Sequence, residues 1–346
     1  MEEINFSPVL TARNFGINSI KLDNISIQDT LKEFKNIKIE KNNAIVDKDN
    51  SNKKLTYGID EKFEENIYKN ANSKLRIKTG NNDQIKIIYD FDDENLQLIS
   101  NIEIIANSNA DVIIEYKSNT DKPCLHNGII RTIANENANI RITVVNLLNN
   151  LSDNFESIEN ELYDNSNVEY TIVDFGGKNS VSNYYTNIIG NNSDNVLKTI
   201  YLGAKDELKD LNYIVELRGK KSNVDIDVQG ALKDNSKKNF KGTIDFKQGC
   251  KKSKGNENEY CMLLSNEAKA IALPMLLCTE HEVEGNHSTA SGKVDKSALF
   301  YLMSRGISYT EAIKLIVKAR FNKIIDAIKD ENVKDEILEE IDKILN

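Results

Sequence analysis

A regular repeat of strand-like segments occupies the middle of the chain and limits its possible folds more than any other feature. Five β-branched residues open these segments, each 28 residues after the one before: Val112, Ile140, Val168, Val196 and Val224. Most of the segments alternate apolar and polar residues, which places one face of a strand inside and the other outside. Small polar residues precede each segment and suit a turn, because their side chains can bond the local backbone.

A second apolar run precedes most of these turns, as in residues 129–133 and 213–217. Two strands in each unit, with the units stacked on one another, are typical of a β-solenoid, since no unit can bury its inward face alone. We therefore predict a mainly β fold: a right-handed parallel β-helix with a 28-residue repeat, a C-terminal helical domain and a small N-terminal region. The alternative is a β-sandwich with coincidental spacing, although sandwich strands are irregularly spaced.

The repeat divides the chain into three predicted parts, residues 1–70, residues 71–292 and residues 293–346. Regular strand alternation begins near Leu75 and Ile85, and it stops at Gly292. The middle part is therefore predicted to be the β-helix, and the last part to be helical.

The N-terminal part has a weaker pattern. Ser26 or Asp29 could cap a short helix that runs through Leu31 and Phe34. Residues 41–54 are rich in Asn, Asp and Lys, and we predict that they form a loop.

The C-terminal part changes to a helical period. Asp295 can cap a helix that Gly306 ends, and Ser308 or Thr310 precedes a longer helix. The longer helix and a third helix each carry one apolar stripe: Ile313, Val317, Phe321, Ile324 and Ile328, then Val333, Ile337, Ile341 and Leu345. These helices could close the end of the solenoid or dock a partner, and periodicity does not choose between the two.

Composition narrows the class of protein. The net charge is −9 and the pI is about 5.2, which argues against nucleic acid as a partner because phosphate binding needs a basic stripe. The first ten residues have no basic region followed by an apolar run, and no segment approaches the roughly 18–20 apolar residues that span a bilayer. The four cysteines are irregularly spaced, so we predict a cytoplasmic protein with reduced thiols and no membrane partner.

Cysteine and histidine are the residue types most able to bind a metal here. All three histidines lie near a cysteine or an acid: Cys124 with His126, Cys278 with His281 and Glu282, and Glu284 with His287. The paired C-x-x-C spacing of structural zinc sites is absent. We interpret Cys124 as a buried small residue, Cys250 and Cys261 as residues without a partner nearby in sequence, and Cys278 as part of a buried strand.

One ordered set of residues near the C-terminus matches a known pattern. It consists of a Pro, a His thirteen residues later, a Gly, an acidic residue, and Leu-Phe-Tyr-Leu leading to Ser-Arg-Gly-Ile: Pro274, His287, Gly292, Asp295, residues 299–302 and residues 304–307. This pattern resembles the C-terminal signature of the SufB/SufD family of SUF iron–sulfur cluster assembly scaffold proteins. The resemblance is strong from about Phe240 to Phe321.

Within that family the chain is similar to SufD. Ser288 follows the matching His, where SufB-type subunits have Glu. Glu259 stands where the cluster-forming cysteine of SufB would fall, and Cys261 is two residues away. The chain departs from many SufD proteins at Gly285, where they have a Cys.

The resemblance implies a role in cluster assembly for His287, which matches a His at the interface of paired C-terminal strands. A neutral imidazole can bind iron and can also move protons, so His287 is a possible iron ligand. Cys278 and Glu282 are the next candidates. The resemblance further implies no stably bound cofactor, but a transient iron–sulfur cluster at a subunit interface.

The same resemblance implies a non-catalytic scaffold subunit with two partners. A SufB-like subunit would pair with the C-terminal edge of the β-helix, and a SufC-like ATPase would bind residues 293–346. The expected ATPase-binding residues are Phe300, Tyr301, Arg305 and Gly306.

Two other functions are weighed against this one. The first is a homodimeric SUF scaffold that works without SufB. The second is a β-helix enzyme acting on polysaccharide, which the absence of Trp and the aromatic content of 7% count against. No nucleotide-binding Walker A or G-x-G-x-x-G pattern is present.

Overall fold

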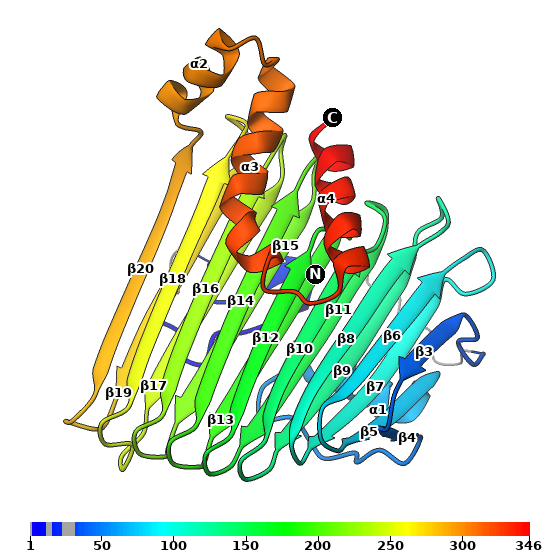
Figure 1. Cartoon of the computed structure of the whole chain (residues 1–346), viewed down its shortest axis with the longest axis vertical. Coiled ribbons are helices and arrows are strands. Elements are labelled where there is room, and N and C mark those ends of the chain that lie inside the picture. Colours follow the sequence, from blue (N-terminus) through cyan, green and yellow to red (C-terminus); the bar gives the residue numbers. More distant parts are fainter. Residues whose placement is uncertain (1, 12–15, 23–31) are drawn as a thin grey trace.

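The computed structural model describes residues 2–11, 16–22 and 32–346, and it is a β-solenoid of about eight turns (Figure 1). Each turn adds one strand to each of two sheets, and successive turns pair in parallel. The predicted solenoid is therefore confirmed, and the β-sandwich is excluded. The short helix expected after Ser26 or Asp29 lies outside the described residues.

Two nine-stranded sheets run the length of the solenoid. Their strands are named below in the order in which they lie side by side, starting at the C-terminal end. Sheet 1 consists of β20 (Glu284–Lys293), β18 (Lys254–Leu263), β16 (Asn223–Leu232), β14 (Asp194–Gly203), β12 (Asn167–Asp174), β10 (Asn139–Leu147), β8 (Asn109–Ser118), β6 (Asp83–Phe91) and β3 (Ile37–Lys41). Sheet 2 consists of β19 (Lys269–Cys278), β17 (Lys237–Phe246), β15 (Leu208–Leu217), β13 (Asn179–Ile188), β11 (Asp153–Leu162), β9 (Leu125–Ala134), β7 (Gln97–Ala106), β5 (Ser73–Thr79) and β4 (Ile45–Asp47). β1 (Glu2–Ile4) and β2 (Ile20–Leu22) form a separate two-stranded antiparallel sheet, whose Ile4, Ile20 and Leu22 pack against sheet 2.

The repeat is less regular than the sequence spacing suggests. Paired residues of sheet 1 are 28 apart from β10 to β12, but 30 apart from β8 to β10, 27 from β12 to β14, 29 from β14 to β16 and 31 from β16 to β18. Val112 consequently pairs with Ile142 and not with Ile140. Val196 faces outward and is half-buried, while its neighbour Leu197 occupies the core. The turns vary in length, so the constant 28-residue spacing was wrong in detail.

Two backbone devices stack the turns that lead from sheet 2 into sheet 1. One residue in each of five successive turns has a left-handed conformation with φ between 52° and 63°: Asn137, Asn165, Asn192, Lys221 and Lys252. Asparagine tolerates this conformation better than most residues, which explains the polar turns of the sequence. Buried serines also stack: the backbone N–H of Ser166 donates to Ser193 Oγ, that of Ser193 to Ser222 Oγ, and that of Ser222 to Ser253 Oγ, at 3.0–3.3 Å.

The interior of the solenoid is apolar along most of its length but polar at one corner. The alternating inward side chains, such as Ile142, Leu197 and Ile226, form one continuous core. Near the corner where sheet 1 strands lead into sheet 2, buried His126 bonds Ser100 Oγ at 3.0 Å and Asn154 Oδ1 at 2.7 Å.

Gly128 makes room for this polar group. A Cβ at that position would lie 2.5 Å from His126 Nε2 and 2.8 Å from a Glu156 oxygen. Burial lowers the pKa of His126 to about 4 and raises the pKa of Glu156 to about 8. Both side chains are therefore neutral near pH 7, although His126 Nδ1 and Glu156 Oε2 are only 4.0 Å apart.

The two ends of the solenoid differ. At the N-terminal end β3 pairs antiparallel with β6, and β4 pairs antiparallel with β5. Phe34 and Ala44 are buried there, and the Phe34 ring packs on Tyr89 and Phe91 with centroids 5.8 and 5.2 Å apart. At the C-terminal end β19 and β20 have no further strand beside them in the described chain. One end is capped and the other is open.

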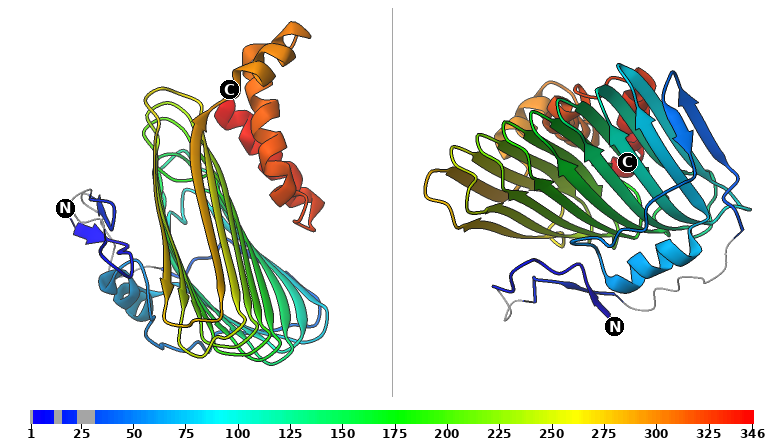
Figure 2. Two further views of the ribbon diagram at one scale, coloured as in Figure 1. Left: turned by 90° about the vertical axis from the view of Figure 1, so that its left-hand side faces the viewer. Right: turned by 90° about the horizontal axis from the view of Figure 1, so that it is seen from below.

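Three C-terminal helices follow β20: α2 (Lys296–Ser304), α3 (Tyr309–Ile325) and α4 (Glu331–Leu345). The predicted caps are confirmed, because the side chains of Asp295 and Ser308 accept hydrogen bonds from the first turns of α2 and α3. Both predicted apolar stripes are buried against the outer face of sheet 1. The pair α3–α4 therefore covers a face of the solenoid and does not close its end (Figure 2).

The N-terminal part covers the opposite outer face, that of sheet 2 (Figure 2). It contains α1 (Glu61–Asn70), whose Phe63 and Ile67 are buried, and a segment that we call the strap, residues 50–60. The sequence prediction was incomplete in this part of the chain. The segment 41–54 was predicted to be a loop but includes β4. The sequence analysis did not predict α1, because this helix carries few apolar residues.

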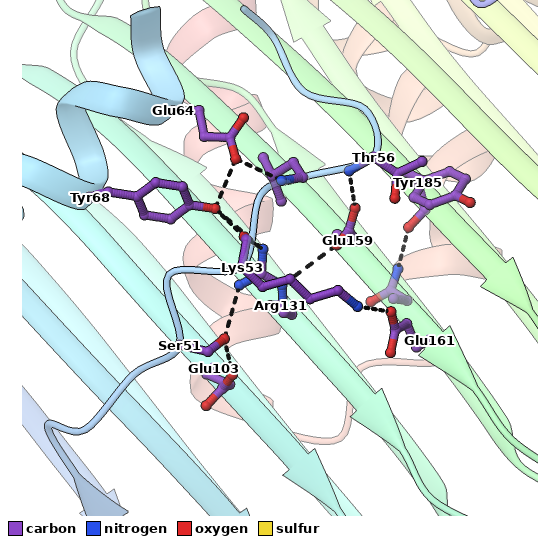
Figure 3. A network of polar contacts seen from close by, with 12 residues as sticks. Ser51, Lys53, Thr56, Glu64, Tyr68, Glu103, Arg131, Glu159, Glu161 and Tyr185 are labelled. Carbon is purple, nitrogen blue, oxygen red and sulfur yellow. Dashed lines mark hydrogen bonds and ion pairs between the residues drawn. The ribbon is translucent and has the colours of Figure 1, made fainter. Parts of the chain in front are cut away.

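A polar network holds the strap to the sheet (Figure 3). At its centre is Arg131, a buried residue of β9, whose guanidinium donates to the carbonyl of Lys53 at 2.5 Å and to Ser51 Oγ at 3.3 Å. Its Nε lies 3.6 Å from Glu159 of β11, and Glu159 accepts from the backbone N–H of Thr56 at 2.6 Å. The strap therefore supplies backbone partners to a buried ion pair, which would otherwise be costly.

Replacing Arg131 should loosen the strap. We expect Arg131→Met to lower the free energy of unfolding by about 3–5 kcal/mol, because it leaves Glu159 buried and unpaired. Urea denaturation measures the loss, and limited proteolysis should show new cleavage within the strap. Adding Glu159→Gln should recover part of the loss. The control Arg141→Met removes a more exposed pair with Asp111 and should cost about 1 kcal/mol or less; an equal loss in both variants would contradict this account.

The polar corner predicts a pH dependence of stability. The folded protein holds a proton on Glu156 up to about pH 8, whereas the unfolded chain loses it near pH 4.5. Stability from this group is therefore full below pH 4.5 and falls as the pH rises to about 8. When the pH is raised from 6.5 to 8, the free energy of unfolding of the native protein should therefore fall. The fall should be larger than that of Glu156→Gln by on the order of 2 kcal/mol.

Urea midpoints at pH 6.5, 7.2 and 8 measure this difference. His126 does not interfere, because its lowered pKa matters only between about pH 6.5 and 4. The exposed Glu136→Gln should follow the native protein, and parallel curves for all three proteins would refute the buried neutral carboxyl.

Candidate functional site

The open end of the solenoid is the largest unpaired backbone feature in the described chain. β19 and β20 each run for ten residues, and neither is covered on its outer edge (Figure 1). Nine of the ten residues of β20 are exposed, because no further turn lies over them. Natural sheets usually protect such edges, so a long uncovered one is typical of a surface that pairs with another chain.

His287 lies near the middle of β20. Its Cα partner in the ladder is Glu257 of β18, which is fully buried inside the solenoid. Side chains of paired residues in a parallel sheet point to the same face. The imidazole of His287 therefore lies on the interior side of the last turn and is exposed because the end is open.

Cys278 ends β19, and the structure corrects our interpretation of it as part of a buried strand. The residue is exposed, and its Sγ donates to the carbonyl oxygen of Glu280 at 2.9 Å. The apolar lead-in to Cys278 does form a strand, but that strand is the last of sheet 2 and has a neighbour on one side only. Glu282 follows in the connection to β20, with its carboxylate 3.8 Å from Lys252 Nζ.

The three residues share one end of the molecule without forming a finished site. Cys278 is the last residue of β19, Glu282 belongs to the connection between β19 and β20, and His287 lies on β20 itself. No group of three or more His, Cys, Asp or Glu side chains in the described residues is arranged to hold a metal ion. Thiolate, imidazole and carboxylate are nevertheless suitable iron ligands.

Sequence reasoning missed a buried charged group directly below the last turn. Glu259 accepts from Lys238 Nζ at 2.7 Å and from the Tyr201 hydroxyl at 3.2 Å, all inside the solenoid. Glu257 has neither carboxylate oxygen hydrogen-bonded, and burial together with Glu259 raises its pKa to about 8. The signal was present in the sequence, because Glu257 and Glu259 occupy the inward positions that Ile226 and Val228 hold one turn earlier.

The other cysteines and histidines lie elsewhere. Cys124, Cys250 and Cys261 are buried, as predicted for Cys124, and burial raises the pKa of each thiol, to about 11 for Cys250 and Cys261. Such thiols are poor nucleophiles. His126 belongs to the interior corner described above, and His281 is exposed in the connection after Cys278.

A second exposed surface lies on α2, which has no buried residue. Phe300, Tyr301 and Met303 are 74%, 57% and 45% exposed, unusually high values for large apolar side chains on one short helix. The Arg305 guanidinium lies 5.4 Å from the centre of the Tyr301 ring. Gly306, with φ of 89°, ends the helix by donating to the carbonyl of Met303, while Ile307 donates to that of Leu302.

We call Phe300, Tyr301 and Met303 the α2 patch. It contains two of the four residues expected to bind an ATPase, and Arg305 and Gly306 shape its C-terminal border.

In the described part of the chain, no helix is long and apolar enough to cross a membrane.

Comparison with known proteins agrees with this anatomy. Residues 71–320 match the family model of the SufBD core domain of the SUF system for FeS cluster assembly. The iron-sulfur cluster assembly protein SufD of Bacillus subtilis (strain 168) is 25% identical over 266 residues, which are 75% of this chain and 60% of that protein.

Two further relatives are named iron-sulfur cluster assembly SufBD family proteins. That of Pyrococcus horikoshii is 29% identical over 222 residues, 63% of this chain and 47% of the relative. That of Staphylococcus saprophyticus is 24% identical over 193 residues, 56% of this chain and 42% of the relative. The chain thus matches between 42% and 60% of the length of these relatives. Because the family model covers well over half of its residues, the chain belongs to the SufB/SufD family of SUF iron–sulfur cluster assembly proteins.

Proposed function

We propose that this protein is a SufD-like scaffold subunit that pairs through its open end with a SufB-like subunit. The observation that carries the proposal is the contrast between the two ends of the solenoid. Antiparallel strands and Phe34 cap the N-terminal end, whereas two ten-residue strands are free on their outer edges at the other. A partner with the same fold can continue both the core and the sheets across that end.

Two further observations favour a SufD-like subunit over a SufB-like one. Of the three relatives compared, the one that matches the largest share of this chain is a SufD. Glu259 occupies the position expected for the cluster-forming cysteine of SufB, and it is engaged with Lys238 and Tyr201. The thiol would then come from the partner, and His287 would face it from β20.

The second partner in the proposal is a SufC-like ATPase bound to the α2 patch. The pair α3–α4 is fixed to sheet 1 by a shared apolar core and by ion pairs such as Lys86 with Asp330 at 3.1 Å and Lys329 with Asp111 at 2.8 Å. α2 projects beyond it (Figure 1). ATP-driven dimerisation of two ATPases would then move the helices and the attached sheets of both subunits.

The iron–sulfur cluster is cargo in this proposal, assembled for a time at the junction of the two subunits. We expect His287 to bind the cluster directly. Cys278 and Glu282 lie at the same end of the solenoid. The function does not require catalysis by this chain. ATP hydrolysis belongs to the partner, and the present chain supplies a surface and ligands.

Removing the imidazole should separate cluster assembly from subunit pairing. We expect His287→Ala to retain the SufB-like subunit in anaerobic affinity purification from the native host, because the backbone edge is unchanged. Cluster formation on the complex, followed by visible absorbance, should fall at least about tenfold. His281→Ala, in the neighbouring connection, is the control and should assemble clusters normally. Equal assembly by both variants would remove His287 from the proposed site.

The α2 patch predicts where the ATPase binds. Phe300→Ser with Tyr301→Ser should weaken ATPase retention by about tenfold or more, since exposed aromatic residues dominate such interfaces. Both side chains are mostly exposed, so thermal stability should change little. The control pair Leu151→Ser with Ile189→Ser removes exposed apolar side chains elsewhere and should bind the ATPase normally. Unchanged retention in the α2 variant would show that the ATPase docks on another surface.

A further inference from the structure

The helix pair α3–α4 is held firmly on the side that lies over β6 and β8. Asp330, the N-cap of α4, pairs with Lys86 of β6 at 3.1 Å, and Glu336 of α4 pairs with Lys117 of β8. Both lysines also pair with Glu115, a buried residue of β8, at 2.9 and 2.5 Å. The helix therefore attaches to lysines that a buried carboxylate already fixes in place, so this side has little freedom to move.

The opposite side, toward the open end of the solenoid, is held by surface contacts. α3 lies over β14 and β16 (Figure 1), and one of its side chains reaches the next strand. The guanidinium carbon of Arg320 lies 3.9 Å from the centre of the Tyr260 ring of β18, and Arg320 Nε donates to Gln229 Oε1 of β16 at 2.7 Å. Lys323 Nζ, on an 83% exposed side chain, lies 3.8 Å from Asp227. We call Arg320, Tyr260 and Gln229 the α3 latch.

The α3 latch is weak enough to open. Arg320 is exposed and Tyr260 is half-buried, so water competes for their contact. An exposed cation–π contact of this kind shifts an equilibrium between a closed and an open form by about two- to fivefold. Met262 of β18 belongs to the apolar core beneath the helices, but apolar contact is non-directional and allows a helix to slide. α3 can therefore leave β18 without unfolding of either element.

The latch closes a ring in the chain. From Tyr260 the ring passes to its ladder partner Ala290 of β20, continues into α2, and returns along α3 to Arg320. Two residues join β20 to α2, and four residues join α2 to α3. α2 is thus tethered at both ends to elements that the latch holds together. A displacement of α2 relative to sheet 1 therefore acts on the latch.

We infer that Arg320 is a positioning residue of the proposed assembly cycle: the α3 latch holds α3 against β16 and β18 at rest and opens when ATP-driven dimerisation of the ATPase displaces α2. This inference rests on the proposed function and adds the place where the helices separate from the sheet. The side held through Lys86 and Lys117 stays attached, so the helix pair rotates about it. A weak contact on one side and a firm one on the other give this rotation a defined direction.

Opening the latch affects the strands that carry the candidate site. On β18, Glu259 and Cys261 flank Tyr260 and face the interior, because successive side chains of a strand point to opposite faces. On β20, Ala290 follows His287 by three residues. The closed latch therefore fixes the last turns from outside, and its opening gives these strands freedom to shift.

A single tryptophan can report the state of the latch. The chain contains none, and Tyr260→Trp keeps an aromatic face for Arg320. Acrylamide quenching of this reporter is measured in the purified complex with the SufB-like subunit and the SufC-like ATPase, with and without a non-hydrolysable ATP analogue. The signal of the complex with native Tyr260 is subtracted. We expect the analogue to increase quenching by about twofold or more, because the guanidinium no longer covers the ring.

Two variants in the reporter background separate the latch from its surroundings. Arg320→Gln should be quenched as strongly without the analogue as the reporter alone is with it. Lys323→Gln is the matched control, since it removes a neighbouring exposed cation of the same helix, and it should respond like the reporter alone. All of these proteins should retain the ATPase equally.

Cluster assembly tests the same contact without tryptophan. Tyr260→Phe keeps the ring and should behave like the native protein. Tyr260→Leu removes the ring, and the ratio of cluster assembly with ATP to that without ATP should fall by about two- to fivefold. Thermal melts of both variants measure whether either change also affects the fold.

The outcomes are distinct. Increased quenching with the analogue, strong quenching of Arg320→Gln without it and normal assembly by Tyr260→Phe support the inference. Equal quenching with and without the analogue, or no effect of Arg320→Gln, overturns the inference, and retention of the ATPase then leaves the proposed function in place. If the native protein retains no ATPase, the proposed function fails and the inference fails with it.

Discussion

The parallel backbone ladder between successive turns is the interaction on which the rest of the structure depends. Each turn lends its hydrogen-bonding groups and its inward side chains to the next, so no turn is complete alone. The stacked serines from Ser166 to Ser253 and the left-handed asparagines follow from this, because every corner must repeat in the same place. A ladder of this kind must also end twice, and the protein treats its two ends in opposite ways. At one end short antiparallel strands and Phe34 cover the core, and at the other the ladder stops.

The open end is also where buried carboxyl groups replace apolar side chains in sheet 1. Glu257 and Glu259 occupy the positions that Ile226 and Val228 hold one turn earlier, and Glu257 has no hydrogen-bond partner. Unpartnered buried carboxyls cost stability, so their place beneath an exposed last turn is typical of a functional region. The free backbone edge and the buried carboxyl groups thus lie at the same end of the solenoid as His287.

The sequence predicted those parts of the fold that depend on local pattern. Alternation identified the strands, and the helix caps at Asp295 and Ser308 were correct because capping is decided by a few adjacent residues. The constant repeat was wrong at Val196, because the spacing of paired residues varies between 27 and 31 residues per unit. A repeat length taken from the sequence is an average over the units and does not show this variation. α1 was missed because its two buried apolar residues, Phe63 and Ile67, make sense only against sheet 2. The candidate site was harder to read for the same reason: the exposure of Cys278 depends on how many turns follow it, and the burial of Glu257 depends on its register with the neighbouring turns.

Both sheets are covered on their outer faces by other parts of the chain, and the open end is joined directly to α2. The N-terminal strap and α1 hold sheet 2, while α3–α4 hold sheet 1 through a shared apolar core. α2 follows β20 after a connection of two residues, so the chain joins the α2 patch more directly to β20 than to any other strand. In the proposed complex, an ATPase bound to the α2 patch would therefore act on the strand that carries His287. A movement of α2 would then reach the open end of the solenoid through the same strand that carries the candidate ligand.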